Sequence, residues 1–260
     1  MTQILTAAPT ILYDNVLYDN RANLVGGIGS EACDWRLGTK WSGTGSVTLE
    51  TNTLTTPVSV CAFAMAAHDL STGGQSISID TSANGGASWQ AKATSTPSSN
   101  IAVYESFTAA TVNKIRLVIT GGSGTWHIGV LLVGLAYTLP KCPTTAAPLK
   151  ASYRSEVPLT RYGTPLGTIP RATPSAMQYT FKGMTIAQIH AAAWEAFIEH
   201  IGYPTGLPFF MSAAWFDGTT TETLTWFCWA TPGWEYAPNY KPGVAYIDEL
   251  SLSLMRAQDA

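Results

Sequence analysis

Apolar and polar residues alternate with a period of two along much of residues 11–137, which is the pattern of half-buried β-strands. Residues 76–80 and 115–119 show the alternation most clearly. Residues 58–65 are apolar at both parities, so we expect a central strand that is covered on both faces. The first half of the chain is therefore predicted to be all-β.

Glycine-rich turns follow two of these strands. Asn84-Gly85-Gly86 supplies residues that tolerate the positive φ of a tight turn, and Trp89 opens the return strand. Residues 121–124 contain three glycines and lead into the apolar stretch 125–135. We expect the strands on either side of this second turn to form a hairpin.

A change in composition divides the chain. Prolines recur from Pro140 to Pro174, which disfavours both helices and central strands. We therefore predict a β-sandwich over residues 1–139, a proline-rich linker or extended arm over 140–174 and a second domain over 175–260.

The second domain is predicted to hold one helix on an antiparallel sheet. Thr185 and Gln188 form a capping-box pattern, and Gly202 followed by Pro204 ends the helix. The apolar positions recur at helical spacing, with Trp194 and Ile198 widening the stripe formed by Ile186, Ile189, Ala193, Phe197 and Ile201. The predicted strands are residues 177–181, 207–216, 222–230 and 244–254, and in the last of these Leu250, Leu252 and Leu254 alternate with Ser251 and Ser253. The expected fold class is mainly β, a jelly-roll sandwich followed by a small α+β domain.

Charge and hydropathy exclude several function classes. Only 12% of the residues are charged, the formal net charge is −3 and there is no Lys/Arg run, so we do not expect nucleic-acid binding. The most apolar stretch, residues 128–139, is about half the ~20 residues of a membrane-spanning helix. The N-terminus lacks the pattern of a secretory signal, so we expect synthesis in a cytoplasm and no membrane insertion.

The four cysteines, Cys33, Cys61, Cys142 and Cys228, are widely spaced and show no zinc-site pattern. Cys61 and Cys228 lie in apolar strand-like stretches, so buried free thiols are the favoured interpretation. The spacing does not determine the disulfide state of the four.

Three segments of the first half together resemble the galactose-binding-like (discoidin-type) jelly-rolls. These are Asn23 with residues 34–41, the strand and turn of residues 77–89, and residues 114–119 leading into 127–130. The resemblance covers roughly residues 11–138. It implies a jelly-roll fold, and it implies a glycan binder, a surface binder or a purely structural module.

The second half resembles bacteriophage tail and baseplate proteins in its sheet–helix–sheet order, with residues 194–197 in the helix, Pro208-Phe209-Phe210 in a strand and residues 247–254 at the C-terminal end. This resemblance implies a structural virion component of a tail tip or baseplate, assembled in a host cytoplasm with other copies of itself and other tail proteins. The alternative is a glycan-binding module that recognises a cell surface.

No catalytic or metal-binding constellation is found in the sequence, so we expect neither an enzyme nor a cofactor. Glu195 and Glu199 are interpreted as a solvated i,i+4 pair. His68-Asp69 is interpreted as a loop hydrogen-bonding pair, because no nucleophile is recognisable beside it. Asp14, Asp19 and Asn20 match no defined calcium loop.

The candidate ligand-binding residues lie in the entry loop of the predicted sandwich. An exposed ring that stacks on a sugar needs hydrogen-bonding groups beside it, and Trp35 and Trp41 have Arg36 and Lys40 as neighbours. A core position is an equally good interpretation of these two tryptophans, and it is the favoured one for Trp89 and Trp126.

Overall fold

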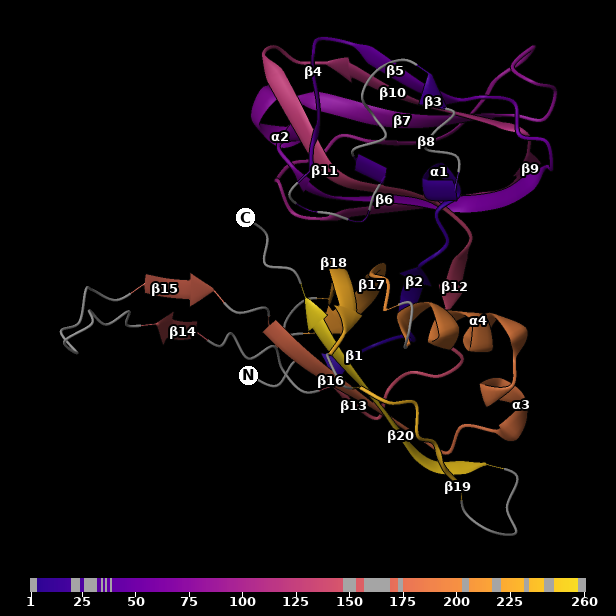
Figure 1. Ribbon diagram of the computed structural model, residues 1–260, viewed down its shortest axis with the longest axis vertical. Coiled ribbons are helices and arrows are strands. Elements are labelled where there is room, and N and C mark those ends of the chain that lie inside the picture. The colour runs from indigo at the N-terminus through magenta and orange to yellow at the C-terminus, as the bar shows by residue number, and fades with distance from the viewer. Residues whose placement is uncertain are drawn as a thin grey trace, which may run out of the picture.

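The computed structural model describes residues 4–19, 24–25, 32–33, 35, 37, 39–146, 153–156, 169–172, 175–202, 206–216, 221–231, 234–240 and 246–256. Over these residues the protein is mainly β. An antiparallel β-sandwich is joined to a second antiparallel sheet that carries the helices α3 and α4 (Figure 1).

The sandwich consists of two sheets, drawn in violet to pink in Figure 1. Among the described residues, one sheet has five strands in the order β3 (Leu24–Val25), β5 (Val47–Thr51), β10 (Lys114–Gly121), β7 (Gln75–Ser82) and β8 (Gln90–Ser95). The facing sheet has four in the order β4 (Trp41–Thr44), β11 (Thr125–Gly134), β6 (Val58–His68) and β9 (Val103–Val112). Two short helices, α1 (Val16–Asp19) and α2 (Leu70–Gly73), accompany them.

The core between these sheets is built by the alternation seen in the sequence. Ile77 and Ile79 of β7, and Ile115, Leu117 and Ile119 of β10, are all buried in one cluster. Within the five-stranded sheet, β7 and β8 form the predicted hairpin, and Gly85 and Gly86 adopt positive φ in its turn.

The prediction that the strands on either side of residues 121–124 form a hairpin is wrong. Strand β10 pairs with β5 and β7, whereas β11 pairs with β4 and β6, so the glycine turn carries the chain from one sheet to the other. Both strands direct apolar residues into the same core, but from opposite sides. Gly122 has a φ of 64°, and a Cβ there would collide with the carbonyl oxygen of Gly73. Glycine is required at this crossing for both reasons.

Strand β6 is covered on both faces, as predicted. Val60, Phe63 and Met65 belong to the sandwich core, whereas Ala62, Ala64 and Ala66 belong to a separate cluster on the opposite face. A register shift between Val60 and Ala62 separates the two sets, because it inserts Cys61 into an otherwise regular alternation.

The second sheet combines both ends of the chain. Its described strands run in the order β12 (Ala136–Thr138), β2 (Thr10–Leu12), β17 (Phe209–Phe216), β18 (Thr221–Ala230), β20 (Ile247–Arg256), β16 (Ser175–Lys182) and β13 (Thr145–Ala146). β1 (Ile4–Leu5) pairs with β17, and β19 (Asn239–Tyr240) pairs with β20. Three strands from residues 1–139 thus pair in this sheet, and the sandwich lies in the chain between β2 and β12. The division at residue 139 stays a prediction about folding units.

The predicted single helix is two helices, α3 (Ile186–Ile189) and α4 (Ala192–Ile201). The capping box of Thr185 and Gln188 is confirmed. Because the backbone of Ala191 is extended, the two helices do not share one helical phase. Ile189, Trp194, Phe197 and Ile201 are buried, but Ile186 is 42% exposed and Ala193 is also exposed, so these two were wrongly placed in the buried stripe.

Part of the predicted linker forms strands. β13 joins the second sheet, and β14 (Tyr153–Glu156) pairs with β15 (Ile169–Ala172). The β14–β15 ribbon stands apart from both sheets on the left of Figure 1. Residues 147–152, 157–168 and 173–174 of the predicted linker lie outside the described residues.

The sandwich and the second sheet share an apolar interface. Trp35 and the outward alanines of β6 cluster with Phe210 of β17 and Phe227 of β18. Val130 and Leu132 of β11 complete this cluster from the sandwich side. The four-stranded sheet is therefore buried between two cores.

All four cysteines lie in the described ranges and are free. Cys33 and Cys228 are buried, whereas Cys61 and Cys142 are half-buried. Burial raises the pKa of the Cys228 thiol, which favours the inert thiol form. Within the described residues, no helix combines the length and apolar character needed to cross a membrane.

Candidate functional site

The two tryptophans proposed to stack on a ligand are both buried. Trp41 is 1% exposed and meets Trp126 edge to face in the sandwich core, with ring centroids 4.9 Å apart. Trp35 is 9% exposed and lies in the interface cluster, 5.5 Å from the His200 ring. The core interpretation is therefore right for both rings, and neither presents an open face for stacking. Lys40 is exposed and Arg36 lies outside the described residues, so their roles stay predictions.

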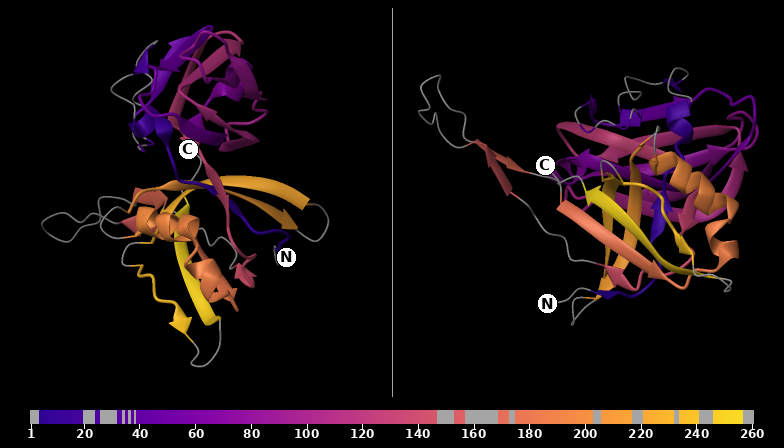
Figure 2. Two further views of the ribbon diagram at one scale, coloured as in Figure 1. Left: turned by 90° about the vertical axis from the view of Figure 1, so that its right-hand side faces the viewer. Right: turned by 60° about the horizontal axis from the view of Figure 1, so that its bottom comes forward.

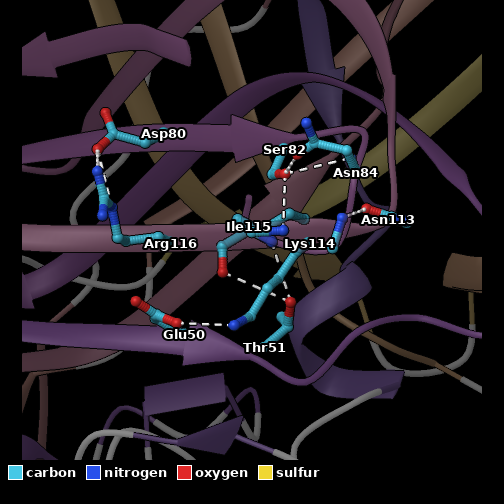
Figure 3. Close-up of polar contacts among 11 residues, drawn as sticks. Glu50, Thr51, Asp80, Ser82, Asn84, Asn113, Lys114, Ile115 and Arg116 are labelled. Atoms are coloured by element: carbon cyan, nitrogen blue, oxygen red, sulfur yellow. Dashed lines mark hydrogen bonds and ion pairs between the residues drawn. The ribbon is translucent and has the colours of Figure 1, made fainter. Parts of the chain in front are cut away.

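A network of charges covers the exposed side of the five-stranded sheet (Figure 3). Arg116 donates from Nε and Nη2 to the same Asp80 oxygen at 3.0 and 2.7 Å, and Lys114 pairs with Glu50 at 2.9 Å. The Arg116 guanidinium also lies over the Trp89 ring, 4.4 Å from its centroid. Trp89 is thus half-buried beneath a cation, and each charge in the network has a partner. This arrangement stabilises the sheet and leaves no unpaired charge for a ligand.

The turn beside this network is fixed by its own side chains. Ser82 Oγ accepts from the backbone N–H of Gly86 at 2.9 Å, and Asn84 Oδ1 accepts from that of Ser88 at 2.9 Å. Asn113 Oδ1 accepts from the N–H of Gly85 at 2.9 Å, which ties the turn to the start of β10. The adjoining cavity has a volume of about 90 Å³, well below the ~300–1,000 Å³ of ordinary ligand pockets.

Ser42, His127 and Asp69 form a line across β4 and β11. Ser42 Oγ lies 2.8 Å from His127 Nδ1, and Asp69 Oδ2 lies 3.8 Å from His127 Nε2. Asp69 Oδ1 also accepts from the backbone N–H of His127 at 2.6 Å. Asp69 therefore acts as a loop hydrogen-bonding residue, as the sequence predicted, although its partner is His127. The adjacent His68 instead places its Nε2 2.7 Å from the carbonyl oxygen of Ile101.

This line resembles a Ser–His–Asp triad in composition alone. Ser42 and His127 are cross-strand neighbours in the regular β4–β11 register. Acyl transfer requires a nucleophile beside donors aimed at the developing oxyanion. A serine in the middle of a regular strand lacks the sharp turn that brings backbone N–H groups to that position. We interpret Ser42 and His127 as a cross-strand hydrogen-bonded pair and Asp69 as a loop residue that accepts from the backbone of His127.

A hollow of about 420 Å³ lies beside β20 in the second sheet. It is lined by one aromatic side chain, Trp234, and by a predominantly polar set of residues, Glu235, Ala237, Asn239, Asp248, Glu249, Ser251 and Ser253. Trp234 Nε1 donates to the carbonyl oxygen of Ser251 at 3.1 Å, and its ring contacts that of Tyr236 at 6.4 Å. The hollow thus combines a fixed, half-buried indole with exposed carboxylates and an amide.

One side of this hollow could be predicted from the sequence. The alternation along β20 assigned the leucines to the core, and Leu250, Leu252 and Leu254 are buried. The serines between them face the hollow. The sequence pattern did not indicate that residues 234–239 cover this polar face.

A second, more apolar cavity of about 280 Å³ lies beside α4. Ile189, Trp194, Ile198 and Tyr236 line it, together with His190, Glu195 and Glu199. Trp194 Nε1 donates to the Tyr236 hydroxyl at 3.2 Å, which fixes two aromatic side chains of this surface. We call this surface the α4 groove. Within the described residues, no group of three or more His, Cys, Asp or Glu side chains could hold a metal ion.

No protein-family model and no curated protein sequence matches this chain. Solved structures do match part of it. A pectin-binding carbohydrate-binding module is 18% identical with a TM-score of 0.36, and the match covers 52% of this chain and 93% of that one. A family 32 carbohydrate-binding module from Clostridium perfringens, in complex with GalNAc-β-1,3-galactose, is 14% identical with a TM-score of 0.37, covering 45% and 98%.

A chitosan-binding module of a chitosanase/glucanase from Paenibacillus sp. is 19% identical with a TM-score of 0.35, and this match covers 50% of this chain and 96% of that one. Each of these three matches therefore spans about half of this chain and nearly all of the matched chain. The sheets described above, rather than these matches, define the sandwich. The assignment to a phage tail or baseplate stays a prediction.

Proposed function

We propose that this protein is a non-catalytic carbohydrate-binding protein and that its saccharide site is the hollow beside β20. The observation that carries the proposal is the lining of the hollow, which brings the Trp234 side chain together with hydroxyl, amide and carboxylate residues. A sugar ring presents apolar C–H faces and a rim of hydroxyls. It binds where an aromatic face and convergent hydrogen-bonding groups meet.

The volume and the rigidity of the hollow both fit this role. At about 420 Å³ it lies within the ordinary range for small-ligand pockets. The indole is fixed by its bond to Ser251 and by its contact with Tyr236, so little side-chain freedom is lost when a ligand binds. Asn239 can donate and accept, whereas Asp248 and Glu249 accept from sugar hydroxyls.

Trp234→Ala tests the site. We expect it to lower retention of the protein on immobilised polysaccharides and on a glycan array by about tenfold or more, because the stacking face is lost. Trp89→Ala is the matched control, since Trp89 is also half-buried but is covered by Arg116. Binding that is lost with Trp89→Ala and kept with Trp234→Ala would move the site to the sandwich. Absence of any glycan binding by the unaltered protein would refute the proposal.

A second candidate function, structural assembly in a virion tail tip or baseplate, is favoured by the β14–β15 ribbon. Within the described ranges these strands pair only with each other, and an isolated two-stranded hairpin is marginally stable in water. Such a ribbon is suited to contact another subunit.

A further inference from the structure

The lining of the β20 hollow is acidic. Three of its eight residues carry carboxyl groups, Glu235 from the segment 234–240 and Asp248 and Glu249 from β20. All three residues are exposed. No lysine, arginine or histidine is among the described residues that line the hollow. With three carboxyl groups and no basic group, the lining has a formal charge of −3 and favours a ligand that carries positive charge.

One of the three carboxylates has a basic neighbour outside the lining. Glu249 Oε2 lies 3.6 Å from Nζ of Lys182, its cross-strand partner on β16, and these two side chains are 48% and 59% exposed. Within the part of the chain that the structure describes, Glu235 and Asp248 form no ion pair. A cationic ligand would thus meet two unpaired carboxylates and a third whose pairing is exposed to water.

Hydroxyl and amide groups stand beside these carboxylates. Ser251 and Ser253 follow Glu249 at every second position of β20, so the three side chains share one face of the strand. Asn239 of β19 is the cross-strand partner of Glu249. Because Trp234 belongs to the same lining, a ligand that satisfies the hollow needs an apolar face, several hydroxyls and a positive charge. A neutral saccharide supplies only the first two, and a uronic-acid saccharide brings further carboxylates against those of the lining.

The acidic part of the hollow is remote from the sandwich. Asp248 and Glu249 are the second and third residues of β20. Figure 1 and the left view of Figure 2 show β19 and the adjoining start of β20 at the end of the second sheet that points away from the sandwich. A charge on the sandwich is therefore a suitable control for a charge in the hollow.

We propose, on the basis of the saccharide site proposed above, that the hollow selects saccharides with free amino groups, such as oligomers of glucosamine, over neutral and acidic ones. A protonated amine offers three N–H donors to the carboxylates of the lining. Because these carboxylates are exposed, water and salt screen the attraction. Each carboxylate should therefore change the affinity by only about two- to fivefold.

Isothermal titration calorimetry with three oligosaccharides tests this selectivity. The measurement is made at pH 6, where amines are mostly protonated, with hexamers of glucosamine, N-acetylglucosamine and galacturonic acid. The first two differ only in acetylation of the amine, so they are a matched pair. We expect the glucosamine hexamer to bind about tenfold more tightly than its acetylated counterpart, and the galacturonic acid hexamer to bind most weakly. The preference should decrease at high salt.

Three single substitutions test the groups that are responsible. Glu235→Gln and Asp248→Asn each remove one charge with little change in size, and each should reduce the preference for the glucosamine hexamer by about two- to fivefold. Lys182→Gln should increase the preference, because it leaves Glu249 available to the ligand. A misfolded variant would not show such a gain. Glu105→Gln, on β9 of the sandwich, is the matched control and should leave both affinities unchanged.

The possible results distinguish this selectivity from the saccharide site itself. Equal affinity for the three hexamers, all of it lost with Trp234→Ala, would leave the saccharide site in place and overturn the amine preference. Glucosamine binding that survives Trp234→Ala, or that an oligolysine of equal charge matches, would reveal charge attraction alone and would also overturn it. So would the absence of binding to all three hexamers, and the glycan array described above would then decide separately whether the protein binds saccharides.

Discussion

His200 lies where α4 meets the sandwich. Its ring is 5.5 Å from that of Trp35 and 5.3 Å from that of Tyr13, and its Nε2 donates to the Pro208 carbonyl oxygen at 2.9 Å. Burial lowers the pKa of this imidazole from its ordinary 6.5, although the hydrogen bond to Pro208 opposes the shift. The neutral ring is thus the form that this interface accommodates.

Stability should therefore fall as the pH falls below about 6.5. The unfolded chain protonates at its ordinary pKa while the folded His200 resists, so the unfolded state binds more protons and its free energy falls relative to that of the folded state. We expect the free energy of unfolding, measured in urea between pH 7 and pH 5, to decrease more steeply for the unaltered protein than for His200→Phe. Parallel pH profiles for the two proteins would show that His200 does not contribute.

Single residues also show where sequence reasoning reaches its limit. Trp35 and Trp41 lie six positions apart in one segment, and no local pattern separates a core ring from a stacking ring. Their burial depends on residues that are distant in the sequence. Trp41 is covered by Trp126, whereas Trp35 is covered by the second sheet. Trp35 also has a φ of 66°, a backbone state that is uncommon outside glycine.

At the scale of elements, α4 contributes Trp194, Phe197 and Ile201 to the core of the second sheet. The Phe197 ring is fully buried and meets Phe209 edge to face, with ring centroids 5.1 Å apart, and the Tyr13 ring centroid lies 5.7 Å away. Phe197→Ala should cost about 3–5 kcal/mol of unfolding free energy, because the surrounding rings can refill the cavity only in part. Thermal or urea unfolding measures this loss.

Ile186→Ala provides the comparison within the neighbouring helix. Ile186 is 42% exposed, so its truncation should change the unfolding free energy by about 0.5 kcal/mol or less. A comparable loss for both variants would mean that α4 packs differently from the arrangement described here.

The alternation of residues predicted the strands well, because it depends only on which face is buried. The alternation could not predict which strands pair with one another. The turn from Gly121 to Gly124 is equally compatible with a hairpin and with a crossing between sheets. The difference lies in the pairing of β10 with β5 and β7, which are distant in the sequence. The helix break at Ala191 was missed because the capping signal at Thr185 and the apolar spacing fitted one continuous helix.

At the scale of the whole molecule, the sandwich is attached to the second sheet by two chain connections. β2 leads into it and β12 leads out, and these strands pair with each other, Leu12 with Ala136 and Thr10 with Thr138. The alanine face of β6 then packs on Phe210 and Phe227. A domain that is attached by a single flexible linker can reorient freely. Two adjacent connections and an apolar interface prevent such reorientation of the sandwich.

This double attachment affects multivalent binding. In a repeating assembly of copies, the sandwiches and the β20 hollows would be presented at a constant spacing and direction. A rigid array gains avidity only on a surface whose ligands repeat at a matching interval, because geometry that forbids simultaneous engagement removes the gain entirely. The orientation fixed by β2 and β12 would thus make such an assembly selective for the spacing of its ligands as well as for their chemistry.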